Sequence, residues 1–130
     1  MALALLDASV IIAFRDPADA LHRRAVAAFR TYGSHELVLP ASVYAEVLVA
    51  PLRHGSAAVA SLEAFISDFG MRIVSLTPEI ARRAAALRAA TPSLRLPAAF
   101  VLATGDALEA AVVLTGDEAW PKLSARARLM

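Results

Sequence analysis

The chain alternates between short, mostly apolar runs and longer segments in which apolar side chains recur at helical spacing. Apolar runs of four to eight residues are typical of strands that are buried on both faces of a sheet. These runs predict strands at residues 2–6, 36–39, 71–76 and 111–114, and a short edge strand at 126–130. Because strands and helices alternate, the pattern predicts an α/β fold with a central, mostly parallel sheet flanked by helices.

The segments between these strands carry helix signals. Residues 56–69 space their large apolar side chains at helical intervals and are followed by Gly70, a common helix stop. Thr77, Pro78 and Glu79 combine an N-cap, a proline at the first helical position and an early acid, which predicts a helix to about residue 90. Further helices are predicted from Ser9, over 18–32, after Pro40, and from Pro97 to Glu109.

Composition supports one soluble α/β unit. The 130 residues suffice for a single domain spanning 1–130. The mean hydropathy is high, at +0.58, but the longest charge-free stretches are far shorter than the roughly 20 residues of a membrane-spanning helix. The first residues, MALALLD, have no basic residue before the apolar run, unlike a signal peptide. The chain also has no cysteine, so it has neither disulfides nor thiolate metal ligands, and we expect a cytoplasmic location.

The net charge of +1 does not by itself indicate a nucleic-acid-binding protein. Any RNA contact therefore needs a local group of cations, and guanidinium groups match phosphate well. Arg95 is the strongest candidate, and Arg15, Arg83 and Arg88 are weaker ones, because exposed charges are usual on helices. Trp120 either stacks on a base or packs under its loop, and packing is the favoured interpretation for a lone tryptophan.

Three acids stand where predicted strands meet the segments that follow them. Asp7 ends the first strand, Glu46 lies early in the helix after the second, and Asp117 follows the strand at 111–114. Ligands of such sheets bind beyond the carboxyl ends of the strands, so we expect these side chains to converge. Converging carboxylates repel one another unless a hard cation is present. A carboxylate cluster without histidine or cysteine points to Mg²⁺ or Mn²⁺ and to phosphodiester hydrolysis.

Each acid also has an ordinary interpretation as a helix cap or a solvated loop residue. Asp7 is the hardest to explain in that way, because it directly ends an apolar strand. Other carboxylate enzymes with α/β folds, such as receiver or haloacid-dehalogenase domains, need a second acid beside the first. The neighbours of Asp7 are Leu6, Ala8 and Ser9, which argues against those classes.

The segments LLDASVIIAF, ASVYAEVL, LRLPAAFVLATG and VVLTGDEAW, in this order, resemble the PIN domains of VapC-type toxins from bacterial type II toxin–antitoxin pairs. The resemblance covers essentially the whole chain. It implies a three-layer PIN fold, a Mg²⁺- or Mn²⁺-dependent endoribonuclease, a homodimer, and larger complexes with a VapB-type antitoxin. It also implies metal ligands at Asp7, Glu46 and Asp117, with Ser9 and Thr115 as supporting residues. Ser9 has the alternative role of capping a helix, and Thr115 that of shaping a turn.

One position departs from this pattern. After Leu96-Pro97 the family has an aspartate that binds metal, whereas this chain has Ala98, through either an introduced substitution or a natural loss. Asp106 is eight residues farther along the same predicted helix, about 12 Å along its axis, and is a poor substitute. We therefore expect this chain to be strongly impaired or inactive as a nuclease. The alternative is a PIN-fold module that binds antitoxin or RNA without cleavage, and the class of RNA stays open.

Overall fold

A five-stranded sheet forms the centre of the computed structural model, which describes residues 1–130. The strand order is β3-β2-β1-β4-β5, and every neighbouring pair is parallel. The predicted central sheet, including its C-terminal edge strand, is thus confirmed. The strands are β1 (Leu3–Leu6), β2 (Glu36–Pro40), β3 (Arg72–Val74), β4 (Val112–Thr115) and β5 (Ala127–Leu129).

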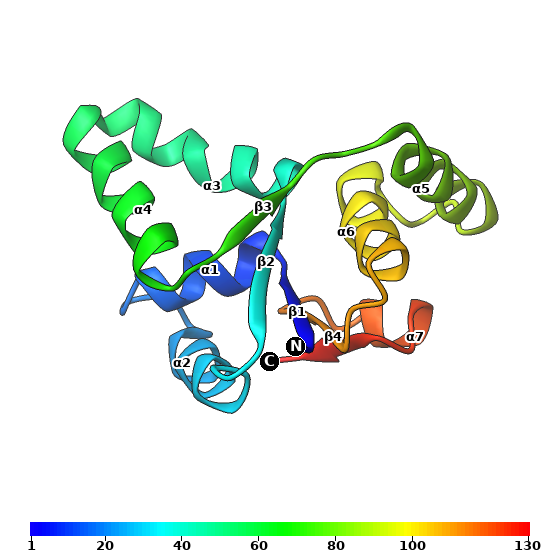
Figure 1. The fold of residues 1–130 in the computed structure, drawn as a ribbon, viewed down its shortest axis with the longest axis horizontal. Helices are drawn as coiled ribbons and strands as arrows, with labels where there is room; N and C mark the ends of the chain where they lie inside the picture. The colour runs from blue at the N-terminus through cyan, green and yellow to red at the C-terminus, as the bar shows by residue number, and fades with distance from the viewer.

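Helices cover both faces of this sheet, which gives three layers. In Figure 1 the first four helices lie on one side of the strands, and α5 and α6 lie on the other. None of the helices has the length and hydropathy needed to span a bilayer. The helices are α1 (Ala8–Arg15), α2 (His22–Thr31), α3 (Ala41–His54), α4 (Ser56–Asp68), α5 (Pro78–Ala90), α6 (Leu96–Ala107) and α7 (Trp120–Leu123).

A single apolar core joins the layers. It contains 29 buried residues, and the interior strands β1, β2 and β4 supply many of its fully buried side chains. Helix α6 is itself largely buried, because residues 101–105 are all enclosed. This packing fixes the amino-terminal end of α6, and therefore Ala98, relative to the sheet.

The strand order reverses between β1 and β4, which are neighbours in the sheet but far apart in the sequence. The chain builds β1, β2 and β3 outward in one direction and then returns to place β4 and β5 on the other side of β1. At the carboxyl ends, the backbone N–H of Asp7 donates to the carbonyl of Leu114 at 3.0 Å. This junction is the topological switch point, where ligands of parallel sheets bind.

Candidate metal and nucleic-acid site

Asp7 stands at the switch point, between the end of β1 and the start of α1. It is the N-cap of α1, and its Oδ1 accepts a hydrogen bond from the N–H of Ala8 at 2.8 Å. A carboxylate at this position satisfies a free helix N–H and faces the positive end of the helix dipole. The same geometry explains why the buried strand ends in an acid, and it leaves Oδ2 for other partners.

Two hydroxyl groups hold that second oxygen. Ser9 Oγ donates to Asp7 Oδ2 at 2.8 Å, and Thr115 Oγ1 donates to it at 3.0 Å. The two residues reach Asp7 from α1 and from the end of β4. Ser9 and Thr115 were predicted to support the site, and both bind the Asp7 carboxylate. These bonds fix the orientation of Asp7 from two separate elements.

The turn after β4 completes this network. The N–H of Gly116 donates to Ser9 Oγ at 3.0 Å, and the N–H of Asp117 donates to Thr115 Oγ1 at 3.0 Å. A Cβ at Gly116 would lie 3.3 Å from Ser9 Oγ and 3.1 Å from Leu21 Cδ1, which is a tight fit. Glycine at this position therefore lets the turn approach α1. Because each hydroxyl both donates to Asp7 and accepts from the turn, the directions of all four bonds are set.

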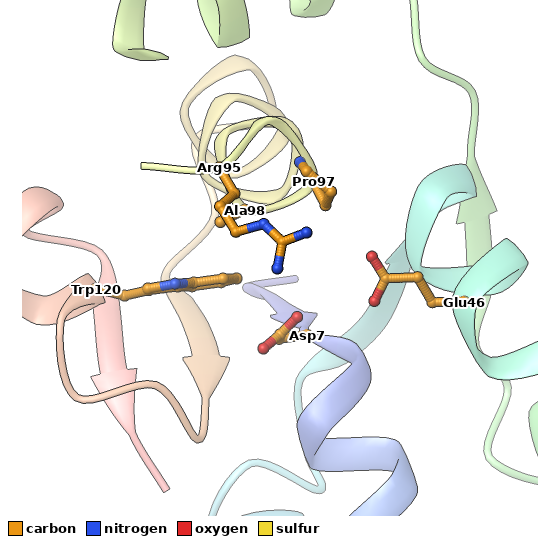
Figure 2. A pocket seen from close by; sticks show the side chains of 6 residues that line it. All are labelled: Asp7, Glu46, Arg95, Pro97, Ala98 and Trp120. Carbon is orange, nitrogen blue, oxygen red and sulfur yellow. The ribbon is translucent and has the colours of Figure 1, made fainter. Parts of the chain in front are cut away.

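Glu46 faces Asp7 across a hollow. It comes from α3, which begins directly after β2, and its carboxylate points toward the same space as that of Asp7 (Figure 2). This acidic hollow has a volume of about 280 Å³. Its lining residues are Asp7, Glu46, Arg95, Pro97, Ala98 and Trp120. The structure thus brings two of the three predicted acids together.

Both carboxylates in the acidic hollow are harder to ionise than ordinary ones. Burial raises the pKa of Asp7, and the charge of Asp117 adds a smaller increase, against the lowering effect of the bonds from Ser9, Thr115 and Ala8. The pKa of Glu46 is raised by desolvation and then by the charge of Asp7. Glu46 as a whole residue is exposed, so its desolvation is confined to the carboxyl end that enters the hollow. The hollow therefore favours a bound cation.

Ala98 and Arg95 form the side of the acidic hollow opposite the two acids. Ala98 lines it directly, so a carboxylate at position 98 would enter the same space as Asp7 and Glu46. The guanidinium of Arg95 reaches over this space in Figure 2 and forms no salt bridge. Asp106 forms an ion pair with Arg126 at 3.3 Å and lines a different hollow, as the spacing along α6 predicted.

Asp117 lies in an adjoining hollow rather than beside the other two acids. This side hollow has a volume of about 170 Å³. Its lining residues are Ser93, Leu94, Arg95, Ala98, Asp117, Ala119, Trp120 and Leu123. No group of three or more histidine, cysteine, aspartate or glutamate side chains converges closely enough to hold a metal ion. The donor set fits a hard divalent cation held by Asp7 and Glu46 that keeps most of its waters.

The other predicted RNA-binding arginines point elsewhere. Arg15 binds Ser61 Oγ at 3.1 Å and lies over the ring of Phe65, 5.4 Å from its centroid. Arg83 pairs with Glu79 at 3.2 Å, and Arg88 donates to the carbonyl of Pro92. None of the three lines the acidic hollow. Their contact with RNA stays a prediction, and it would require the RNA to extend beyond the acidic hollow across the surface of the protein.

Trp120 packs into the structure and also borders both hollows. It is 4% exposed, which confirms the favoured interpretation of packing. Its neighbours in the side hollow, Leu94 and Leu123, were not predicted from the sequence. The signal was weak, because α7 has only four residues and no periodicity can be read over one turn. The position of Trp120 three residues after Asp117 is the one available cue.

Comparisons with known proteins agree with this architecture. A sequence model of the PIN domain matches residues 4–125. A toxin–antitoxin complex from Klebsiella pneumoniae has a TM-score of 0.73 and 23% identity, over 88% of this chain and 86% of that chain. VapBC2 from Rickettsia felis, solved with a DNA fragment from its promoter, has a TM-score of 0.77 and 9% identity, over 98% of each chain.

A third solved structure with this fold is VapC20 from Mycobacterium tuberculosis, described as a sarcin–ricin loop cleaving toxin. It has a TM-score of 0.73 and 17% identity, over 92% of this chain and 93% of that chain. No curated protein sequence matches the chain. At these identities the structural similarities show a shared fold.

Proposed function

The chain belongs to the PIN domain family, and from this premise we propose that it is a VapC-like toxin whose ancestral activity is metal-dependent cleavage of RNA. The observation that carries the proposal is the acidic hollow at the switch point, with Asp7 and Glu46 on one side and Arg95 on the other. Two desolvated carboxylates beside a free guanidinium suit a site for a divalent cation and a phosphodiester.

The residues of the hollow have distinct roles in this proposal. Asp7 and Glu46 would hold Mg²⁺ or Mn²⁺, and Asp117 in the adjoining hollow would add its negative charge from a distance. Ser9 and Thr115 fix the Asp7 carboxylate through their hydrogen bonds. When bound, the cation supplies charge stabilisation and an activated water for hydrolysis. The guanidinium of Arg95 binds the phosphate and orients it for in-line attack.

Ala98 removes one carboxylate from this set, so we propose that the chain as it stands is strongly impaired. A methyl group offers no lone pair to a cation or to a metal-bound water. The loss of one ligand weakens the metal site and its stabilisation of the transition state. In this proposal the fold retains the architecture of a nuclease, and the loss of one side chain at position 98 causes the impairment.

The test compares RNA cleavage by the chain with that of Ala98→Asp and Ala98→Asn variants in the presence of Mg²⁺ or Mn²⁺. We expect Ala98→Asp to cleave at least about 100-fold faster than the chain, which corresponds to ~2.7 kcal/mol in the activation free energy. Ala98→Asn has the same shape without the charge and should stay near the original level. Equal rates for the chain and Ala98→Asp would overturn the assignment of position 98.

A second function is favoured by the same alanine. With only two carboxylates in the acidic hollow, the chain would bind antitoxin or RNA without cleaving it. Cleavage of RNA, or growth arrest on expression, by the unmodified chain would contradict this function. In both cases we propose a VapB-type antitoxin as partner and a homodimer as the basic unit. Sedimentation of the chain alone and with a co-expressed antitoxin tests the assembly separately from the chemistry.

A further inference from the structure

The side hollow adjoins the acidic hollow and has a different character. The two share Arg95, Ala98 and Trp120 as lining residues, so they lie directly side by side. Most residues that line the side hollow are apolar, whereas charged side chains make up half of the lining of the acidic hollow. The apolar residues of the side hollow are Leu94, Ala98, Ala119, Trp120 and Leu123. A ligand that spans both hollows therefore has a charged part and a flat or compact apolar part.

We propose that the side hollow binds one unpaired nucleobase of the RNA, from the nucleotide next to the phosphate held over the acidic hollow. This assignment rests on the proposed function for its choice of ligand. A nucleobase has apolar faces and polar edges, and specific recognition of RNA takes place mostly on bases splayed out of single strands. At about 170 Å³ the hollow is smaller than the roughly 300–1,000 Å³ of pockets for drug-sized ligands, so it suits a single base.

Trp120 supplies a donor that the protein leaves unused. The residue is 4% exposed, and a buried indole N–H usually has a hydrogen-bond partner. Its N–H makes no hydrogen bond within the chain, yet it is not among the enclosed unpartnered atoms, which are His35 Nδ1 and Ser42 Oγ. The indole nitrogen is therefore not fully enclosed, and Trp120 lines both hollows. A carbonyl oxygen of a base would satisfy it.

Asp117 and Ser93 add polar groups to the same hollow. One oxygen of Asp117 accepts from the N–H of Ala119 at 2.9 Å, which fixes the carboxylate and leaves the other oxygen available. An ionised carboxylate only accepts, so it favours the amino group of cytosine over the carbonyl oxygen of uracil at the same ring position. The hollow thus combines a donor and an acceptor for the two kinds of group on the edge of cytosine.

Arg95 connects the base to the phosphate. Its guanidinium reaches over the acidic hollow (Figure 2), and it forms no salt bridge with a protein carboxylate. A phosphate bound there would have its scissile bond beside Asp7 and Glu46 and its base beside Trp120 in the side hollow. The same three shared residues would then align the substrate by its base as well as by its charge.

The single tryptophan of the chain provides a direct test that needs no catalysis. Cytidine 5′-monophosphate is added to the full chain, and Trp120 fluorescence is followed by excitation at the red edge of the indole band. We expect saturable quenching. Leu123→Phe should weaken the binding about tenfold, because the larger ring takes up space in the side hollow that the base needs. The matched control, Leu52→Phe, alters an exposed leucine on α3 and should bind like the original chain.

Two ligand controls separate the base from the phosphate. Ribose 5-phosphate lacks the base and should not quench Trp120, and uridine 5′-monophosphate should bind more weakly than the cytidine nucleotide. Equal affinity of Leu123→Phe and the original chain, with thermal melting showing both folded, would overturn the proposal. So would equal quenching by ribose 5-phosphate.

The outcome is also separable from that of the proposed nuclease function. If Ala98→Asp cleaves RNA with the same KM whether or not Leu123 is replaced by Phe, the nuclease stands and the base site fails. If Ala98→Asp does not cleave but nucleotide binding still depends on Leu123, the base site stands and the nuclease assignment fails.

Discussion

The carboxylates of Asp7 and Glu46 are held close together without a protein cation bonded to either. Three hydrogen bonds from Ala8, Ser9 and Thr115 favour the charged form of Asp7, but burial outweighs them, and its pKa is raised. Glu46 adds a second desolvated charge. Without a bound cation, ionisation of these groups opposes folding, because a raised native pKa means that the native state disfavours the charge.

Replacing Glu46 by Gln tests this electrostatic cost in the metal-free chain. Below the ordinary glutamate pKa of 4.5, Glu46 is protonated in both the folded and the unfolded states, so its charge does not lower the free energy of unfolding. Above its raised native pKa it is charged in both states, and the full cost applies. We therefore expect Glu46→Gln to melt at a higher temperature than the original chain at pH 7, and the difference to shrink as the pH falls toward 4.5.

Differential scanning fluorimetry with a chelator present gives both melting temperatures across this pH range. Glu118→Gln is the matched control, because Glu118 is exposed on the loop after β4 and is not part of the acidic hollow. A Glu46→Gln variant that is less stable than the original chain at pH 7, or whose effect does not change with pH, would contradict the raised pKa.

The hydroxyl of Thr115 links two other residues by hydrogen bonds, whereas that of Thr104 does not. Both are fully buried. Thr115 Oγ1 donates to Asp7 and accepts from the N–H of Asp117, whereas Thr104 Oγ1 donates to the carbonyl of Phe100 in its own helix. Thr115→Val would leave the N–H of Asp117 without its acceptor. We expect it to lower the free energy of unfolding by about 2 kcal/mol more than Thr104→Val does.

Urea denaturation of the two valine variants measures this difference. Thr115→Ser keeps the hydroxyl and should recover most of the loss, which distinguishes the hydrogen bonds from a simple change in shape. Equal losses for Thr115→Val and Thr104→Val would mean that the network around Asp7 adds little stability.

The packing of α6 on β4 depends on the absence of a side chain at Gly105. A Cβ at this position would lie 2.5 Å from Val113 Cγ2, which is too close without movement. Alanine is the better helix former by about 1 kcal/mol, but overpacking in a core costs about 1–3 kcal/mol. We expect Gly105→Ala to be net destabilising by about 1 kcal/mol, as measured by chemical denaturation.

A double-mutant cycle identifies the cause. Val113→Ala removes the contacting methyl groups, so the double variant Gly105→Ala, Val113→Ala should be more stable than the sum of the single effects predicts. Strict additivity would show that Gly105 is required for a reason other than its contact with Val113.

The larger elements were predictable because each carries a local signal. Thr77 caps α5 by accepting from the N–H of Ile80 at 3.2 Å, as the Thr-Pro-Glu segment predicted. Helix α2 begins at His22, later than predicted. The reason is local turn chemistry, because the side chains of Asp16 and Asp19 accept from backbone N–H groups two residues ahead. The short helix α7 was missed, since four residues show no period.

The candidate site was predictable in its acids but not in its geometry. Asp7, Glu46 and Asp117 follow strand ends, and parallel topology brings strand ends to one edge. The spacing of residues says nothing about which hollow each side chain enters, and Asp117 lines the side hollow rather than the acidic one. The positions of Leu94 and Leu123 in the side hollow depend on how the loop before α6 and the short helix α7 pack, which is a tertiary effect.

The site takes its side chains from both halves of the sheet, which are joined along the β1–β4 pair. The half with β1 to β3 contributes Asp7 from the β1–α1 junction and Glu46 from the second turn of α3. The other half contributes Arg95 and Ala98 from the start of α6. A cation bound in the acidic hollow by groups from both halves would stabilise the fold as a whole, because the unfolded chain has no such site. With Ala98, the second half offers the cation no ligand in this hollow.

Metal binding should therefore be visible as a change in the stability of the whole chain. A ligand at 100 times its Kd stabilises the native state by about 2.7 kcal/mol. We expect saturating Mn²⁺ to raise the Tm of Ala98→Asp by several degrees, and to raise that of the original chain and of Ala98→Asn much less. Without Mn²⁺ we expect Ala98→Asp to have a lower Tm than the original chain and Ala98→Asn, because a third carboxylate adds repulsion to Asp7 and Glu46. Scanning calorimetry with and without Mn²⁺ measures both effects, and an equal shift in all three proteins would place the cation away from position 98.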